Sequence, residues 1–161
     1  MNIQLLTVTP QQKQVLQNLL QLYIYDFSEF VRIDVKANGL YTYKHFDDYF
    51  ADSNRFAYLI KADGKYIGFV LVRWMEAEGY FSVAEFFVMK RYRRCGIGRA
   101  IAMQVFDKHK GRWQIRQMAG NKPAQQFWHS VIEVYTKGRF TEHFVDGRLV
   151  QGFDNVEEVS T

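Results

Sequence analysis

Two glycines one residue apart stand among arginines in the segment YRRCGIG, residues 92–98. An apolar run typical of a strand, VAEFFVM, precedes the segment, and RAIAMQVFDKH, with the apolar spacing of a helix, follows it. Backbone N–H groups at the start of a helix bind phosphate oxygens, and glycines at that point let an anion approach closely. The pattern therefore indicates an anion site. Taken alone, it also fits a tight turn with solvated arginines.

The segment differs from the common nucleotide-binding loops. No Gly-Lys-Ser/Thr follows, as a P-loop requires, and no third glycine completes a dinucleotide-binding fingerprint. Cys95 lies inside the segment and suggests a covalent mechanism, but no adjacent His and Asp arrangement supports one. We therefore interpret the thiol as incidental to the chemistry.

Composition bounds the class of protein. The 161 residues are 48% hydrophobic and 17% aromatic, which is typical of a globular chain, and we expect a single domain over residues 1–161. One cysteine excludes an internal disulfide framework and fits a reducing compartment. No apolar run is long enough to cross a bilayer, and the first residues lack a signal peptide pattern, so we expect a cytoplasmic protein without a membrane partner. The net charge of +4 is too mild to indicate any particular partner.

Periodicity and turn residues predict the elements that must hold the glycine segment. The expected strands are residues 3–8, 55–61, 66–74, 80–89, 112–118 and two strands around Asp146-Gly147. The expected helices follow the capping-box pattern at Thr9-Pro10, cover residues 98–109, and begin after Asn121. Residues 27–50 are mixed and predict a short helix with irregular connections. This order predicts an α/β (α+β) fold in which a mixed, mostly antiparallel central sheet has helices on both faces.

Two motifs resemble those of one enzyme family. Residues 93–98, RRCGIG, match the R/Q-x-x-G-x-G/A signature of GNAT-type N-acetyltransferases, which occurs at the junction after the fourth strand. Residues 121–128, NKPAQQFW, resemble the family's second motif, N-x-x-A-x-x-F-Y. The order of elements agrees over nearly the whole chain. The resemblance implies a GNAT-like fold in which the fourth and fifth strands splay apart.

The resemblance implies acetyl-CoA as the co-substrate and no metal. The acyl-pantetheine arm then lies in the gap between the splayed strands and pairs with exposed backbone groups of the fourth strand, while the amides from Arg94 to Arg99 hold the pyrophosphate. Asn121 hydrogen-bonds the pantetheine arm in this family, and its alternative role as a helix cap is compatible with that. The implied cofactor-binding residues are Phe86, Phe87, Val88, Arg93, Arg94, Cys95, Gly96, Ile97, Gly98, Arg99, Asn121 and Phe127.

The chemistry implied is direct attack by a primary amine on the thioester in a ternary complex. Glu85, the only acid inside the fourth apolar strand, corresponds to the base that family members use, and burial would raise its pKa towards a useful range. The alternative is a surface acid paired with an arginine such as Arg73. The family's tyrosine for thiolate protonation is replaced by Trp128. The thiolate is then protonated by Tyr135 or by a water molecule, or it leaves without an acid. Tyr135 can equally be a packed aromatic side chain.

Acceptor specificity in this family comes from the first helices, here LYIYDFSEFVRIDVKANGLY, residues 22–41. Tyr23, Tyr25, Asp26 and Glu29 form an acidic and aromatic surface suited to a cationic amine, or else a solvated helix end. The acceptor itself stays open between a small amine, an amino acid, an aminoglycoside and a protein terminus.

Other functions compete with this hypothesis. A non-catalytic acyl-CoA-binding or sensor module is suggested by the missing motif tyrosine. A nucleic-acid-binding domain is disfavoured, because the arginines form no basic tail and no RNA-binding signature is present, so we expect no nucleic-acid partner. The C-terminal hairpin is a candidate surface for a homodimer.

Overall fold

The central sheet of the computed structural model, which describes residues 1–157, has the strand order β1-β2-β3-β4-β5-β7-β6. Its strands are β1 (Ile3–Thr7), β2 (Arg55–Ala62), β3 (Lys65–Met75), β4 (Tyr80–Val88), β5 (Arg112–Met118), β6 (Thr141–Val145) and β7 (Arg148–Asp154). Only β4 and β5 are parallel, and the other neighbours are antiparallel. The predicted mixed, mostly antiparallel sheet is confirmed.

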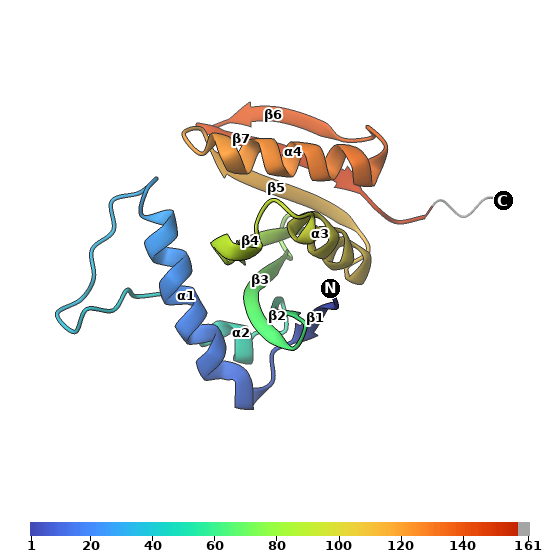
Figure 1. Cartoon of the computed structure of the whole chain (residues 1–161). Helices are drawn as coiled ribbons and strands as arrows, with labels where there is room; N and C mark the ends of the chain where they lie inside the picture. Colours follow the sequence, from blue (N-terminus) through green and yellow to red (C-terminus); the bar gives the residue numbers. More distant parts are fainter. Residues whose placement is uncertain (158–161) are drawn as a thin grey trace.

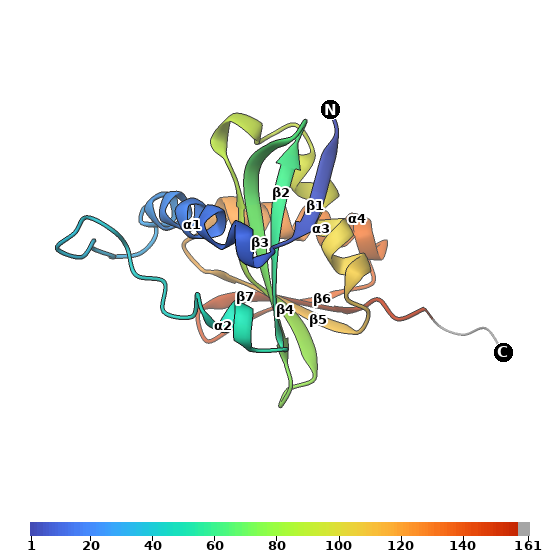
Figure 2. The same ribbon diagram turned by 90° about the horizontal axis from the view of Figure 1, so that it is seen from below.

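Helices cover both faces of the sheet, as predicted (Figures 1 and 2). They are α1 (Lys13–Phe27), α2 (Asp48–Ala51), α3 (Ile97–Lys108) and α4 (Lys122–Thr136). On one face, Leu16 and Leu20 of α1 are buried against Leu59 and Leu71 of the sheet. On the other face α3 and α4 close a second, larger apolar cluster around Phe106. The sheet is therefore covered on both sides, which requires apolar residues to alternate between two cores along its central strands.

The turns follow the sequence closely, and the connection after α1 has the predicted short helix with irregular segments. Asp63-Gly64 and Asp146-Gly147 both have positive φ angles, which is the conformation of two-residue hairpin turns. Residues 28–47 contain neither a helix nor a strand, and the only helix of this region is the single turn of α2. In both ribbon views this connection projects away from the sheet (Figures 1 and 2).

Strands β4 and β5 splay apart, as the resemblance implied. Their only registered pair is Phe81 with Trp113, so the two strands separate towards their C-terminal ends. A bulge between Val83 and Glu85 leaves Ala84 without a partner on β3. A bulge bends its strand and changes the direction of the side chains beside it. The gap between the two strands and the bulge in β4 thus lie at the same level of the sheet.

Gly68 of β3 marks a close backbone approach at the open end of β4. It pairs with Val88, and a Cβ atom added there would lie 2.0 Å from the carbonyl oxygen of Phe87. We expect Gly68→Ala to lower the free energy of unfolding by about 3 kcal/mol or more, because two paired strands must move apart. Urea denaturation measures the loss. Gly120→Ala is the control, since a Cβ there meets nothing within 4 Å. Equal stability of the two variants would contradict the close approach.

Candidate functional site

The segment between β4 and α3 presents a row of unpaired backbone amides. Arg94 and Gly96 both have positive φ, 62° and 82°, and α3 begins at Ile97. The first bond of the helix runs from the Ala100 amide to the Gly96 carbonyl at 3.1 Å. Within the described part of the chain, no amide from residue 94 to residue 99 donates a hydrogen bond. Consecutive N–H groups in such a turn at a helix N-terminus form a concave anion site.

The two glycines of this segment serve different purposes. Gly96 adopts the left-handed conformation, and a Cβ there would meet nothing, so its backbone conformation is what favours glycine. At Gly98, a Cβ would lie 3.1 Å from Cε2 of Phe127 on α4. The second glycine therefore also allows α3 to pack closely against α4.

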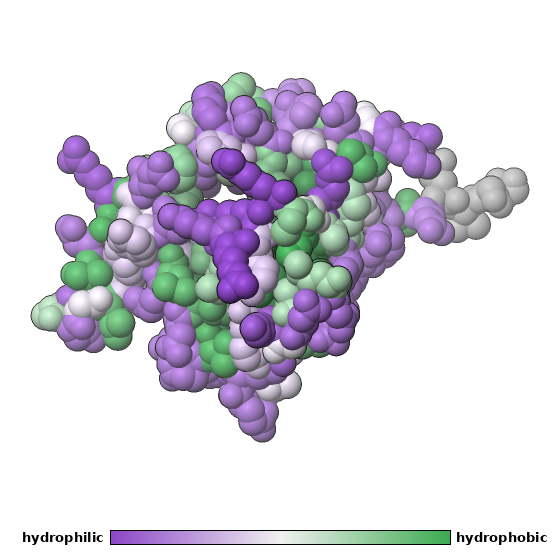
Figure 3. Space-filling model, viewed as in Figure 1, coloured by the Kyte–Doolittle hydropathy of each residue, from purple (hydrophilic) through white to green (hydrophobic). Residues whose placement is uncertain are grey.

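All three arginines of the segment are exposed, and hydrogen bonds tie Arg93 to neighbouring elements. The Arg93 Nε donates to the Val88 carbonyl at 2.7 Å, and a terminal guanidinium nitrogen donates to Asp26 at 2.7 Å. Arg93 thereby ties the segment to the end of β4 and to α1. Arg94 and Arg99 are exposed beside the amides. Figure 3 shows strongly hydrophilic side chains gathered over the start of α3, which gives an anion a cationic surface to approach.

Among residues 1–157, the edge of β4 that faces β5 has no ladder partner beyond Phe81. Phe86 and Phe87 lie on opposite faces: the Phe86 ring packs against Phe127 and Trp128, and the Phe87 ring against Tyr23. Their side chains belong to the two cores, as expected for a strand whose backbone would do the binding. The nearby Asn121 side chain caps α4 by accepting a hydrogen bond from the Ala124 amide at 3.2 Å. The helix-cap role is thus present.

Glu85 lies beside the bulge, on the face of the sheet that α1 covers. The Tyr23 hydroxyl of α1 donates to Glu85 Oε2, and the Tyr43 hydroxyl donates to Oε1 at 3.4 Å. Burial raises the pKa of Glu85, while the two hydrogen bonds oppose the rise. Burial and the adjacent charge of Glu85 also raise the pKa of both tyrosines, which keeps them protonated as donors. Glu85 forms no ion pair with Arg73. The group is a partly buried carboxyl whose pKa is raised by burial.

The structure does not bring Tyr135 to Glu85. Its hydroxyl donates to Asp107 at 2.8 Å and accepts from Asn155 at 3.2 Å. Its ring packs against Phe153, which pairs with Trp113 at the closed end of the gap. Trp128, in contrast, is buried near the gap, where its indole contacts Phe86 of β4.

The four predicted acceptor residues do not gather at one place. The Tyr23 hydroxyl donates a hydrogen bond to Glu85. Asp26 instead forms ion pairs with Arg93 and, at 3.6 Å, with Lys90. Tyr25 is 69% exposed, and Glu29 is exposed in the turn after α1. Sequence reasoning missed Tyr43, because it lies in the irregular segment 28–47, where no periodic pattern shows which side chains turn inwards.

Among residues 1–157, no three His, Cys, Asp or Glu side chains lie close enough together to hold a metal ion. No helix in this range has the length and apolar character needed to span a membrane.

Comparisons with known proteins agree on one family. The model of the Acetyltransferase (GNAT) family matches residues 18–131. An acetyltransferase from Thermus thermophilus superposes with a TM-score of 0.71 at 17% identity, covering 96% of this chain and 97% of that one. The PaiA N-acetyltransferase from Thermoplasma acidophilum, in complex with coenzyme A, gives a TM-score of 0.65 at 10% identity, with coverages of 96% and 99%. No curated protein matches the sequence significantly.

A third solved structure carries the acylated cofactor. It is a protein of Bacillus anthracis str. Ames assigned as a streptothricin acetyltransferase, in complex with acetyl coenzyme A. Its TM-score is 0.59 at 13% identity, and the alignment covers 96% of this chain and 99% of that chain. At such low identity these structures show a shared fold.

Proposed function

Since this chain belongs to the GNAT family of acetyltransferases, we propose that it transfers an acetyl group from acetyl-CoA to a primary amine, with Glu85 as the general base. The observation that carries the proposal is the Glu85 carboxyl, which is partly buried beside the bulge of β4 and has a raised pKa. The position of Glu85 on the part of β4 beyond its registered pair with β5 supports this role.

The residues present fit acetyl-CoA. The unpaired amides from Arg94 to Arg99 would hold the pyrophosphate, with the exposed side chains of Arg94 and Arg99 adding positive charge. The edge of β4 from Phe86 to Val88, which has no registered partner on β5, would pair with the pantetheine arm through its backbone groups other than the Val88 carbonyl. The Arg93 side chain already donates a hydrogen bond to the Val88 carbonyl, so we assign Arg93 the role of positioning the loop. When bound, acetyl-CoA supplies an activated thioester carbonyl, which a neutral amine attacks directly in a ternary complex.

Glu85 would take the proton that the attacking amine loses, directly or through a water molecule. Its raised pKa improves the match between base and amine, and the hydrogen bonds from Tyr23 and Tyr43 hold the carboxylate in one orientation. At the position of the family's tyrosine, Trp128 offers only an N–H donor. The proposal therefore assigns thiolate protonation to water rather than to Tyr135, whose hydroxyl is bound elsewhere.

Acetyl-CoA should raise the melting temperature, because it binds the folded state alone. The double variant Arg94→Glu/Arg99→Glu should lose this shift, since it places two negative charges beside the phosphates. The matched control is Arg94→Gln/Arg99→Gln, which loses the same side-chain contacts and should keep a reduced shift. Thermal unfolding with and without acetyl-CoA measures all three proteins. An unchanged shift in the glutamate variant would place the phosphates elsewhere.

The proposal as a whole is tested by incubating the protein with acetyl-CoA and a panel of primary amines, with free thiol release and product mass as readouts. We expect thiol release that depends on the amine. Acetyl-CoA binding without turnover on any amine would favour the alternative, a non-catalytic acyl-CoA-binding module, for which the tryptophan in place of the motif tyrosine is the specific observation.

A further inference from the structure

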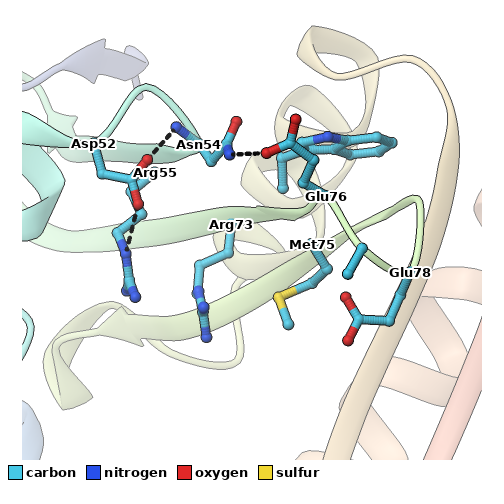
Figure 4. Close-up of a pocket in the computed structure, with 9 residues that line it drawn as sticks. Asp52, Asn54, Arg55, Arg73, Met75, Glu76 and Glu78 are labelled. Atoms are coloured by element: carbon cyan, nitrogen blue, oxygen red, sulfur yellow. Dashed lines mark hydrogen bonds and ion pairs between the residues drawn. The ribbon is translucent and has the colours of Figure 1, made fainter.

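Two arginines face each other on the side of the sheet that carries Glu85. Arg55 of β2 and Arg73 of β3 are directly opposite in the strand register. Arg73 lies two residues after Leu71, which is the cross-strand partner of Glu85, so alternation places both groups on the same face. Figure 4 shows the two arginine side chains extending side by side in the same direction. Like charges directly opposite in a sheet are destabilising, so this pair carries an electrostatic cost.

Buried polar atoms at this place lack hydrogen-bond partners. The Arg55 side chain is 10% exposed, and its Nε is buried without a hydrogen bond, although Asp52 lies 3.5 Å away as an ion-pair partner. Within residues 1–157, the buried Tyr49 hydroxyl of α2 makes no hydrogen bond of ordinary geometry, although Tyr43 and Arg55 lie close enough to it to affect its pKa. The Arg55 guanidinium carbon lies 5.3 Å from the centre of the Tyr49 ring. Leaving such groups unsatisfied costs free energy that a polar ligand would recover.

The surrounding acids do not neutralise Arg73. Both arginines line a cavity of about 250 Å³, whose other charged residues are Asp52, Glu76 and Glu78. Glu76 accepts a hydrogen bond from the side-chain Nδ2 of Asn54 at 3.2 Å, and Asp52 is the partner of Arg55 (Figure 4). Within residues 1–157, Arg73 forms no ion pair with a carboxylate. Its planar fork of donors remains available for an oxyanion.

The arginine pair lies on the same face of the sheet as the proposed catalytic carboxyl, further along β3. The charge of Arg55 partly opposes the rise in the pKa of Tyr43, so the guanidinium lies near the hydroxyl that donates to Glu85. Along β3, Arg73 is two residues beyond the partner of Glu85, a spacing of roughly 6.6 Å at the usual rise of a strand. A ligand that contacts both groups therefore needs several bonds between its amine and its anion.

We propose that Arg55 and Arg73 bind an oxyanion of the acceptor, a carboxylate or a phosphonate, while the acceptor amine lies at Glu85. The acceptor class is thus a small ω-amino acid or its phosphonate analogue, in which several bonds separate the two charges. This inference rests on the proposed acetyltransferase function. The arginines form charge-assisted, two-pronged hydrogen bonds to the anion, and the ligand offsets the repulsion between them.

The test compares acetylation of glycine, 4-aminobutyrate, 5-aminovalerate and 3-aminopropylphosphonate with that of butylamine, which has no anion. We expect kcat/KM for 4-aminobutyrate or 5-aminovalerate to exceed that for butylamine by on the order of 10- to 100-fold, mainly through KM, as expected for hydrogen bonds to charged groups. Glycine should be poor, because its charges are too close together. The phosphonate arm shows which oxyanion is preferred.

Arg73→Gln should reduce this preference to about the level of butylamine, and Arg73→Lys should restore part of it, because lysine keeps the charge without the fork. Arg139→Gln, at an exposed arginine beyond α4, is the control and should keep the full preference. A readout without catalysis is the melting temperature at low salt. There 5-aminovalerate should stabilise the wild type and not Arg73→Gln, and the unliganded Arg73→Gln should be at least as stable as the wild type, since the repulsion is relieved.

The two hypotheses fail differently. If no amine is acetylated, the proposed function fails, and the thermal shift with 5-aminovalerate still decides whether the anion site exists. If amines are acetylated but butylamine is as good as the amino acids, or if Arg73→Gln keeps their preference, the anion site is overturned.

Discussion

Replacing Glu85 with glutamine is expected to lower kcat by on the order of 10²-fold or more at neutral pH, in line with the contribution of general bases. Glutamine keeps the size of the side chain and one acceptor oxygen for the tyrosine hydroxyls, but it cannot take a proton. The Kd for acetyl-CoA should change little, because the amides proposed to hold the pyrophosphate lie beyond the end of β4. Steady-state kinetics at saturating amine, together with a direct binding measurement, separates the two effects.

The pH dependence gives this prediction a second readout. Wild-type kcat should fall as the pH drops through the raised pKa of Glu85, because the base becomes protonated, and Glu85→Gln should lack this step. Stability should show the opposite trend. A carboxyl whose pKa is raised by folding binds more protons in the native state, so stability decreases as pH rises from 4.5, the ordinary value, to the raised one. That decrease should also disappear in Glu85→Gln.

The matched control is Glu133→Gln, because Glu133 is an exposed acid on α4 and is distant in sequence from β4. It should retain wild-type turnover and both pH trends. If Glu85→Gln turned over amines almost as fast as the wild type, Glu85 would be removed from the mechanism, whatever its pKa.

Truncating Trp128 to alanine is expected to lower the free energy of unfolding by about 3–5 kcal/mol. The indole is 7% exposed and makes an edge-to-face contact with Phe86 of β4, with ring centres 5.2 Å apart. It also contacts Phe106 of α3, so it joins α4 to both the sheet and the neighbouring helix. Chemical denaturation measures the loss.

Trp128→Phe separates packing from chemistry at the same position. Phenylalanine keeps an aromatic ring between α4 and β4 but has no N–H donor, so this variant should retain most of the activity. If Trp128→Phe folds normally, binds acetyl-CoA normally and is inactive, the indole N–H takes part in the reaction and the packing interpretation fails.

Local sequence determined most elements of the fold and the position of the cofactor loop. Asp63-Gly64 and Asp146-Gly147 are hairpin turns because these residues tolerate positive φ, and α3 begins after Gly96 for the same reason. Asn121 caps α4 as predicted, since its side chain is short enough to reach the first turn. These features depend on neighbours within a few residues, and the sequence therefore displays them directly.

The site around Glu85 was decided by tertiary structure. The sequence showed one acid in an apolar strand, but the bulge at Ala84 and the packing of α1 determine that it meets Tyr23 and not Arg73. Tyr43 reaches the same carboxyl from a segment without any periodic pattern.

Tertiary structure likewise assigned the charged groups their partners. Asp26, expected to meet the acceptor, pairs with Arg93, and Arg55 faces Arg73 because of the register of β2 on β3. Such convergence arises from strand register and helix packing between residues far apart in the chain. Residue type and spacing along one element do not contain that information, because each side chain's partner is set by how a different element is placed against it.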